Sequence, residues 1–84
     1  MIRIYPKSRA CDARYQQGYQ LMQEIFNDLV FGGNLAGRVP AGTEEVFIDT
    51  DDPDVIRKSA MNIWAVNLGF DFQPDDLVSF EIVR

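Results

Sequence analysis

Residues 12–33 read DARYQQGYQLMQEIFNDLVFGG, and this stretch decides the fold. When the stretch is placed on a helical wheel, one arc carries mainly glutamine, asparagine and acidic side chains, and apolar side chains occupy the other arc. Two glycines at the end of the stretch supply the positive φ that terminates helices. The stretch therefore predicts an amphipathic helix from Asp12 to Phe31 with one buried face. Large apolar side chains of that face recur at the spacing of an α-helix: Tyr15, Tyr19, Met22, Phe26 and Leu29.

Strands are expected on both sides of this helix. Residues 2–5 alternate in polarity and are stopped by Pro6, which predicts a first strand. Residues 35–39 are a weak strand candidate, and the proline and glycine in residues 40–43 favour a tight turn. Residues 45–49 form a stronger strand, whose three consecutive apolar residues indicate cover on both faces. The region after the first helix is therefore interpreted as a hairpin.

A second helix is predicted to begin within residues 51–54, which read DDPD. Its carboxylates can accept hydrogen bonds from the free amides at a helix N-terminus and complement the positive end of the helix dipole. Its proline has the φ that the first helical turn requires. This helix is expected to run to Leu68, with Gly69 as its cap. Apolar residues cover more than one of its faces. The side that carries Met61 and Trp64 is either covered by other segments or exposed to a partner or a second copy.

The remaining sequence predicts a final strand. Residues 73–76 turn the chain into residues 77–83, which place Val78, Phe80 and Ile82 on one face. Phe70 and Phe72 are candidates for a short additional strand.

The order of these elements indicates a single α+β domain over residues 1–84. It matches the ferredoxin-like βαββαβ arrangement, an antiparallel sheet with two helices on one face. The alternative is a three-stranded βαβαβ sandwich, if residues 35–39 form a loop.

Composition limits the classes of function. At 46% apolar and 25% charged residues, the chain is too hydrophobic for disorder, and its apolar runs are too short to predict a membrane span. Thirteen acids and eight bases give a net charge of −5, with +2 in residues 1–42 and −7 in residues 43–84. This acidic balance argues against direct nucleic-acid binding and favours a protein partner with a basic surface.

The sequence lacks the residues of most catalytic templates. Histidine is absent, which excludes Ser/His and Cys/His pairs and imidazole metal ligands. A single cysteine, Cys11, excludes an intrachain disulfide and favours the cytoplasm; it is interpreted as a small residue at the helix entry. The acidic run from Asp49 to Asp54 does not fit the EF-hand pattern. Counted from Asp49, the sixth residue is Asp54 where an EF-hand loop has glycine, and the twelfth is Ala60 where it has glutamate. We therefore expect no metal, no cofactor and no enzymatic activity.

These observations favour a non-enzymatic protein-binding module that acts as an inhibitor or regulator. In size and charge the chain resembles phage-type inhibitors, including anti-CRISPR proteins that present carboxylates where phosphates would lie. Alternatives are a metal-dependent phosphoryl-transfer or hydrolytic enzyme built on the acidic run, and a subunit of a larger assembly. A homodimer through the second helix is also considered. The expected partner-binding residues are Glu44, Glu45, Asp49, Asp51, Asp52, Asp54, Asp75 and Asp76, with Trp64 and Tyr15 as anchors.

Overall fold

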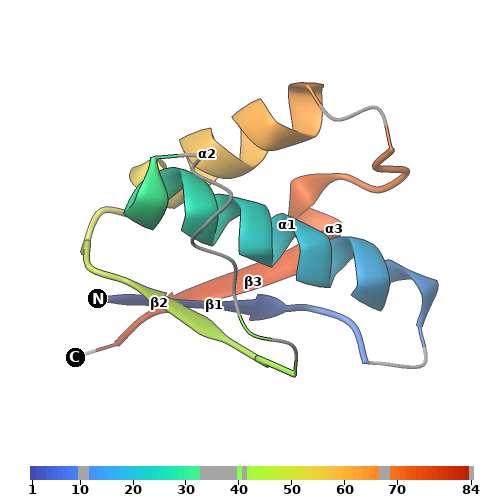
Figure 1. Cartoon of the computed structure of the whole chain (residues 1–84), viewed down its shortest axis with the longest axis horizontal. Helices are drawn as coiled ribbons and strands as arrows, with labels where there is room; N and C mark the ends of the chain where they lie inside the picture. The colour runs from blue at the N-terminus through green and yellow to red at the C-terminus, as the bar shows by residue number, and fades with distance from the viewer. Residues whose placement is uncertain (10–11, 33–39, 41, 67–68, 84) are drawn as a thin grey trace.

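The computed structural model of the chain describes residues 1–9, 12–32, 40, 42–66 and 69–83. Figure 1 shows helices α1 and α2 on one side of a small sheet, with the short helix α3 leading into the last strand. The elements in chain order are β1 (Ile2–Pro6), α1 (Ala13–Phe31), β2 (Val46–Ile48), α2 (Pro53–Val66), α3 (Pro74–Leu77) and β3 (Val78–Ile82).

The sheet is antiparallel, with the strand order β2-β1-β3. Ile4 of the central strand lies opposite Val46 on one side and Phe80 on the other. The α+β class is confirmed, and the described ranges contain three strands. The expected strand at residues 35–39 lies outside the described residues, so the full ferredoxin-like sheet is not established.

The first helix begins and ends as its sequence predicts. Asp12 has extended backbone and accepts a hydrogen bond from the Arg14 amide at 2.9 Å, which is an N-cap. At the other end Gly32 adopts a left-handed φ of 61° and donates its amide to the Asn27 carbonyl. Gly18, Leu21, Met22 and Ile25 form the buried face.

Capping of α1 by Asp12 should make stability depend on pH. Hydrogen bonds from the Arg14 side chain and amide hold the pKa of Asp12 below its ordinary value. A depressed carboxyl pKa gives stability that is fully present above the unfolded value of about 4 and is lost as the pH falls through the folded value. We expect Asp12→Asn to remove this part of the pH dependence, because asparagine also caps helices but does not titrate. Urea unfolding of both proteins across this acidic range tests it; parallel pH profiles would contradict it.

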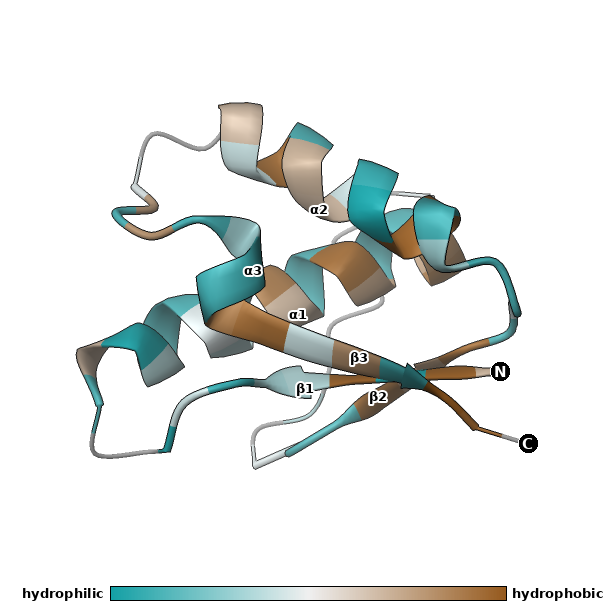
Figure 2. Cartoon of the chain, turned by 180° about the vertical axis from the view of Figure 1, so that it is seen from behind, coloured by the Kyte–Doolittle hydropathy of each residue, from teal (hydrophilic) through white to brown (hydrophobic). Residues whose placement is uncertain are grey.

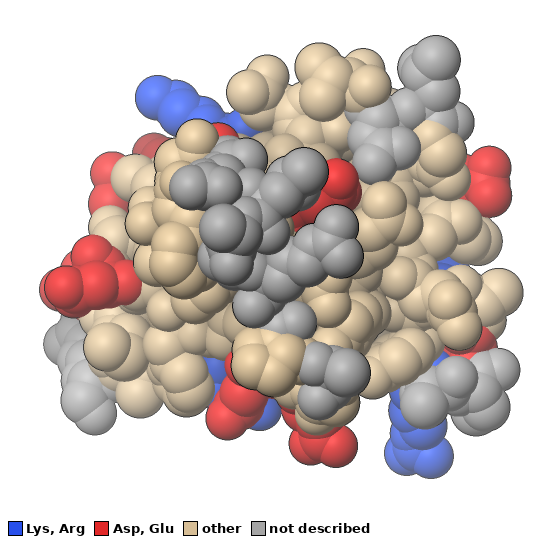
Figure 3. All heavy atoms as spheres, in the orientation of Figure 1, with Lys and Arg blue, Asp and Glu red and all other residues tan. Residues whose placement is uncertain are grey.

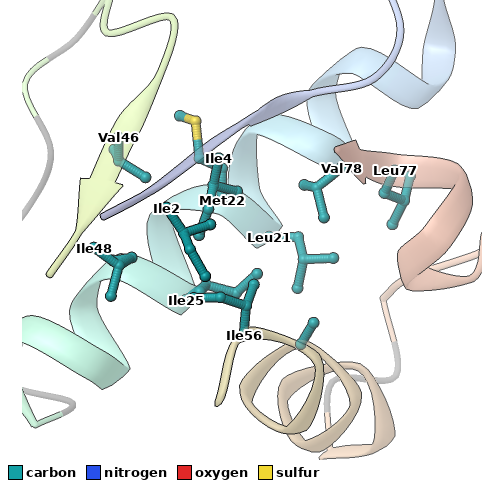
Figure 4. Packing of buried hydrophobic residues seen from close by; sticks show 11 residues of the cluster. Ile2, Ile4, Leu21, Met22, Ile25, Val46, Ile48, Ile56, Leu77 and Val78 are labelled. Carbon is teal, nitrogen blue, oxygen red and sulfur yellow. The ribbon is translucent and has the colours of Figure 1, made fainter. Parts of the chain in front are cut away.

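The core lies between the sheet and the helices (Figures 2 and 4). Ile2 and Ile4 of β1 are completely buried and point toward α1, and Ile56 of α2 closes the cluster. The Trp64 indole donates a 2.8 Å hydrogen bond to the Phe72 carbonyl, which ties α2 to the segment before α3. The core residues are Ile2, Ile4, Leu21, Met22, Ile25, Val46, Ile48, Ile56, Ala60, Leu77 and Val78.

Three expectations need correction. Strand β2 is not covered on both faces, because Phe47 is 41% exposed on the side of the sheet away from the helices. Phe70 and Phe72 form no strand; they pack against the core as partly buried side chains. Residues 73–76 do more than turn the chain, since Pro74–Leu77 is a short helix. The predicted start of α2 is confirmed, and its expected last residues, 67 and 68, lie outside the described part.

None of the helices, as far as their residues are described, combines the length and the apolar character that crossing a membrane requires.

Candidate protein-binding surface

The turn between β2 and α2 holds four of the predicted partner-binding acids. Asp51 forms an ion pair with the amino terminus of Met1. Asp52 caps α2 by accepting the Asp54 amide at 3.0 Å, and Asp54 pairs with Arg57 at 3.1 Å. Asp49 is exposed beside them. Each of the three paired or capping carboxylates thus has a local role, and within the described ranges no three acidic side chains gather as metal ligands would.

A second group of acids surrounds Arg3 on the open face of the sheet. The Arg3 guanidinium donates hydrogen bonds to the carboxylate of Glu45, which precedes β2, and to that of Glu81 in β3. The bond to Glu81 measures 2.7 Å. Its guanidinium also lies 4.3 Å from the ring centre of Tyr5. Glu44, beside Glu45, is exposed. The open face is therefore acidic around one neutralising arginine.

The third group, Asp75 and Asp76, is exposed on α3. The Asp75 carbonyl accepts a 3.1 Å hydrogen bond from the Lys7 ammonium, directly after the end of β1. Asp51, in contrast, contacts Met1 at the start of β1.

The first and third groups lie at opposite ends of β1, and the group around Arg3 lies between them. Met1 and Lys7 are six residues apart, which is roughly 20 Å along a strand. That exceeds the Debye length of about 8 Å at physiological ionic strength. Figure 3 accordingly shows acidic side chains at several separate places. The predicted acids do not gather into one patch; they recur beside β1 from its start to its end.

The two predicted aromatic anchors are both half-buried. Trp64 is held by its hydrogen bond to Phe72, as expected if the segment around residue 72 covers that side of α2. Tyr15 packs near Tyr19, with ring centres 6.1 Å apart. Met61 remains 53% exposed and Val66 76% exposed, so part of the apolar surface of α2 is uncovered.

The sequence reading missed a groove between α2 and β3. It has a volume of about 200 Å³, and its wall includes Met61, which the sequence had marked as part of an apolar side. The other walls of the groove come from α3 and β3, which are distant from α2 in the sequence, so no local sequence pattern could predict the groove. The lining residues are Ile56, Arg57, Ala60, Met61, Pro74, Asp75, Val78 and Phe80.

Known proteins offer no guide to this surface. No protein-family model, curated protein or solved structure matches the chain.

Proposed function

We propose that this chain is a non-enzymatic protein-binding module that acts in the cytoplasm through its acidic exterior. The observation that carries the proposal is the recurrence of acids beside β1, at Met1, at Arg3 and at Lys7. Seven of the eight predicted acids are exposed, and Glu45 is half-buried. Exposed carboxylates spread over roughly 20 Å suit a broad basic surface better than a small substrate.

Electrostatic complementarity of this kind favours an inhibitory or regulatory role. A basic groove that binds a phosphate backbone also attracts carboxylates placed at intervals, which would make the chain a nucleic-acid mimic of the phage-type, anti-CRISPR-like kind. Such charges mainly accelerate encounter and discriminate between partners.

The ferredoxin-like form of the fold is also a proposal. A hairpin that ends in β2 would add residues 35–39 to the outer edge of β2, giving a four-stranded sheet with β1 inside. The observed order β2-β1-β3 agrees with that arrangement.

Removing the charges of the β2–α2 turn should slow association. In the variant Asp51→Asn, Asp52→Asn and Asp54→Asn, amide oxygens preserve the capping geometry while the negative charge is lost. We expect the on-rate toward a partner captured from the native host to fall about tenfold at low salt, with a smaller change in the off-rate. Surface plasmon resonance measures both rates. A wild-type on-rate that is unchanged between about 50 and about 500 mM salt would refute the proposal.

The two alternatives remain hypotheses with direct tests. A metal-dependent enzyme built on Asp49, Asp51, Asp52 and Asp54 should release or absorb heat when titrated with Mg²⁺, Mn²⁺ or Ca²⁺. A subunit of a larger assembly should co-purify with its partners in fixed stoichiometry.

A further inference from the structure

Strand β3 has one unpaired edge. Among the residues that the structure describes, it pairs with β1 alone, as the last strand in the order β2-β1-β3. Val83 donates to the Met1 carbonyl and Lys7 to the Leu77 carbonyl, both at 2.9 Å, so the odd-numbered residues of this strand bond to β1. Because hydrogen-bonded and non-hydrogen-bonded pairs alternate, the backbone groups of Phe80 and Ile82 point the other way. No residue in the described ranges pairs with that edge.

This free edge lies beside the groove between α2 and β3. Phe80 shares the helix-facing side of the sheet with Ile4, its partner in the register, and its side chain lines the groove with Met61 and Ile56. Figure 2 shows α2 and α3 on the same side of β3. A strand placed against β3 would therefore find open backbone groups and an apolar hollow side by side.

Side-chain alternation determines what such a strand should contain. A guest residue opposite Phe80 points into the helix layer, toward the apolar groove. Its two neighbours point to the open face, beside Ser79 and Glu81. The Glu81 side chain is 52% exposed although it pairs with Arg3. The groove wall itself holds one acid, Asp75, and one base, Arg57, whose guanidinium lies 5.3 Å from the ring centre of Phe80.

We propose that this edge accepts an extended segment of a partner protein as an added strand, with an apolar residue opposite Phe80 and basic residues on either side of it. The inference rests on the proposed function and specifies where and how the basic partner binds. Backbone hydrogen bonds would supply affinity and alternate side chains specificity. A second copy of this chain is the less suitable occupant, because each copy carries a net charge of −5.

The probe is a blocked peptide of alternating lysine and apolar residues, acetyl-KVKLKVK-amide, titrated into ¹⁵N-labelled protein. We expect the largest chemical-shift changes at the amides of Phe80 and Ile82, together with slower exchange of these amides. A peptide with proline in place of the central leucine should bind at least about tenfold more weakly, because it loses one backbone donor and the side chain opposite Phe80. The acidic peptide acetyl-EVELEVE-amide should not bind.

Two charge reversals of equal size separate this site from general attraction. Glu81→Lys is expected to weaken binding of the basic peptide about tenfold, whereas Asp71→Lys, at an exposed acid that bonds Gln17 of α1 in the helix layer, should change it less than about twofold. Glu81→Gln keeps a hydrogen-bond acceptor for Arg3 and should weaken binding of the basic peptide to an intermediate extent. It replaces Glu81→Lys as the test variant if the lysine substitution unfolds the protein.

The outcomes distinguish this inference from the proposed function. Equal losses from Glu81→Lys and Asp71→Lys would overturn the strand site and leave the acidic module standing. A peptide that does not bind would also overturn the strand site, while the salt dependence of the captured partner would still decide the proposed function. Concentration-dependent shifts of Phe80 and Ile82 without peptide, with a dimer in sedimentation, would replace the basic segment by a second copy.

Discussion

Replacing Ile4 with alanine is expected to lower the free energy of unfolding by about 2 to 5 kcal/mol. Ile4 is completely buried on the central strand and lies between Val46 and Phe80. Truncation would remove apolar contacts and leave a cavity that neither neighbouring strand could close without losing register. A chain of 84 residues is stabilised by only about 4 to 13 kcal/mol, so the variant should be partly unfolded at elevated temperature. Urea denaturation measures the loss.

The matched control is Val66→Ala, which also shortens an apolar side chain. Val66 is 76% exposed on α2, so its truncation should change stability by less than about 0.5 kcal/mol. Similar losses in the two variants would mean that the core is not centred on β1.

The local part of the fold could be predicted from the sequence because its signals are short-range. The helical period of residues 12–31, the Asp12 cap and Gly32 define α1, and the acids with Pro53 define the start of α2. The orientation of the β2 side chains was harder to predict. The three residues of this strand are all apolar, and alternation cannot tell an inward from an outward side chain in so short a run. Only pairing of Phe47 with Arg3 places it on the open face.

The site was less predictable because it depends on tertiary placement. Charge and composition predicted exposed acids, but whether these acids form one patch depends on the length of β1, because Asp51 and Asp75 lie at its two ends. The groove joins Ile56 to Phe80, residues whose proximity follows from the packing of α2 near an edge strand. Trp64 could be recognised as important, yet its role as a donor to Phe72 required the path of the chain after α2.

Gly18→Ala should destabilise the protein although it improves the intrinsic helix propensity of α1. At an exposed helical position this change stabilises by about 1 kcal/mol. Gly18 is buried, however, and a Cβ there would lie 2.4 Å from the carbonyl oxygen of Leu77. That oxygen belongs to backbone and already accepts the Lys7 amide at 2.9 Å, so it cannot move aside without disturbing β1. We expect a net loss of about 1 to 3 kcal/mol, in the range of overpacked cores.

Gln20→Ala is the control, since Gln20 is exposed on the same helix and should change stability by less than about 0.5 kcal/mol. Urea unfolding compares the two variants, and a Gly18→Ala protein more stable than wild type would contradict the close approach of α1 to Leu77.

Gly18→Ala should also affect the proposed strand site on β3. Leu77 immediately precedes β3, and Pro74 in the same short helix lines the groove, so displacement of α3 should shift the Phe80 amide and weaken the basic peptide. Gln20→Ala should leave both unchanged.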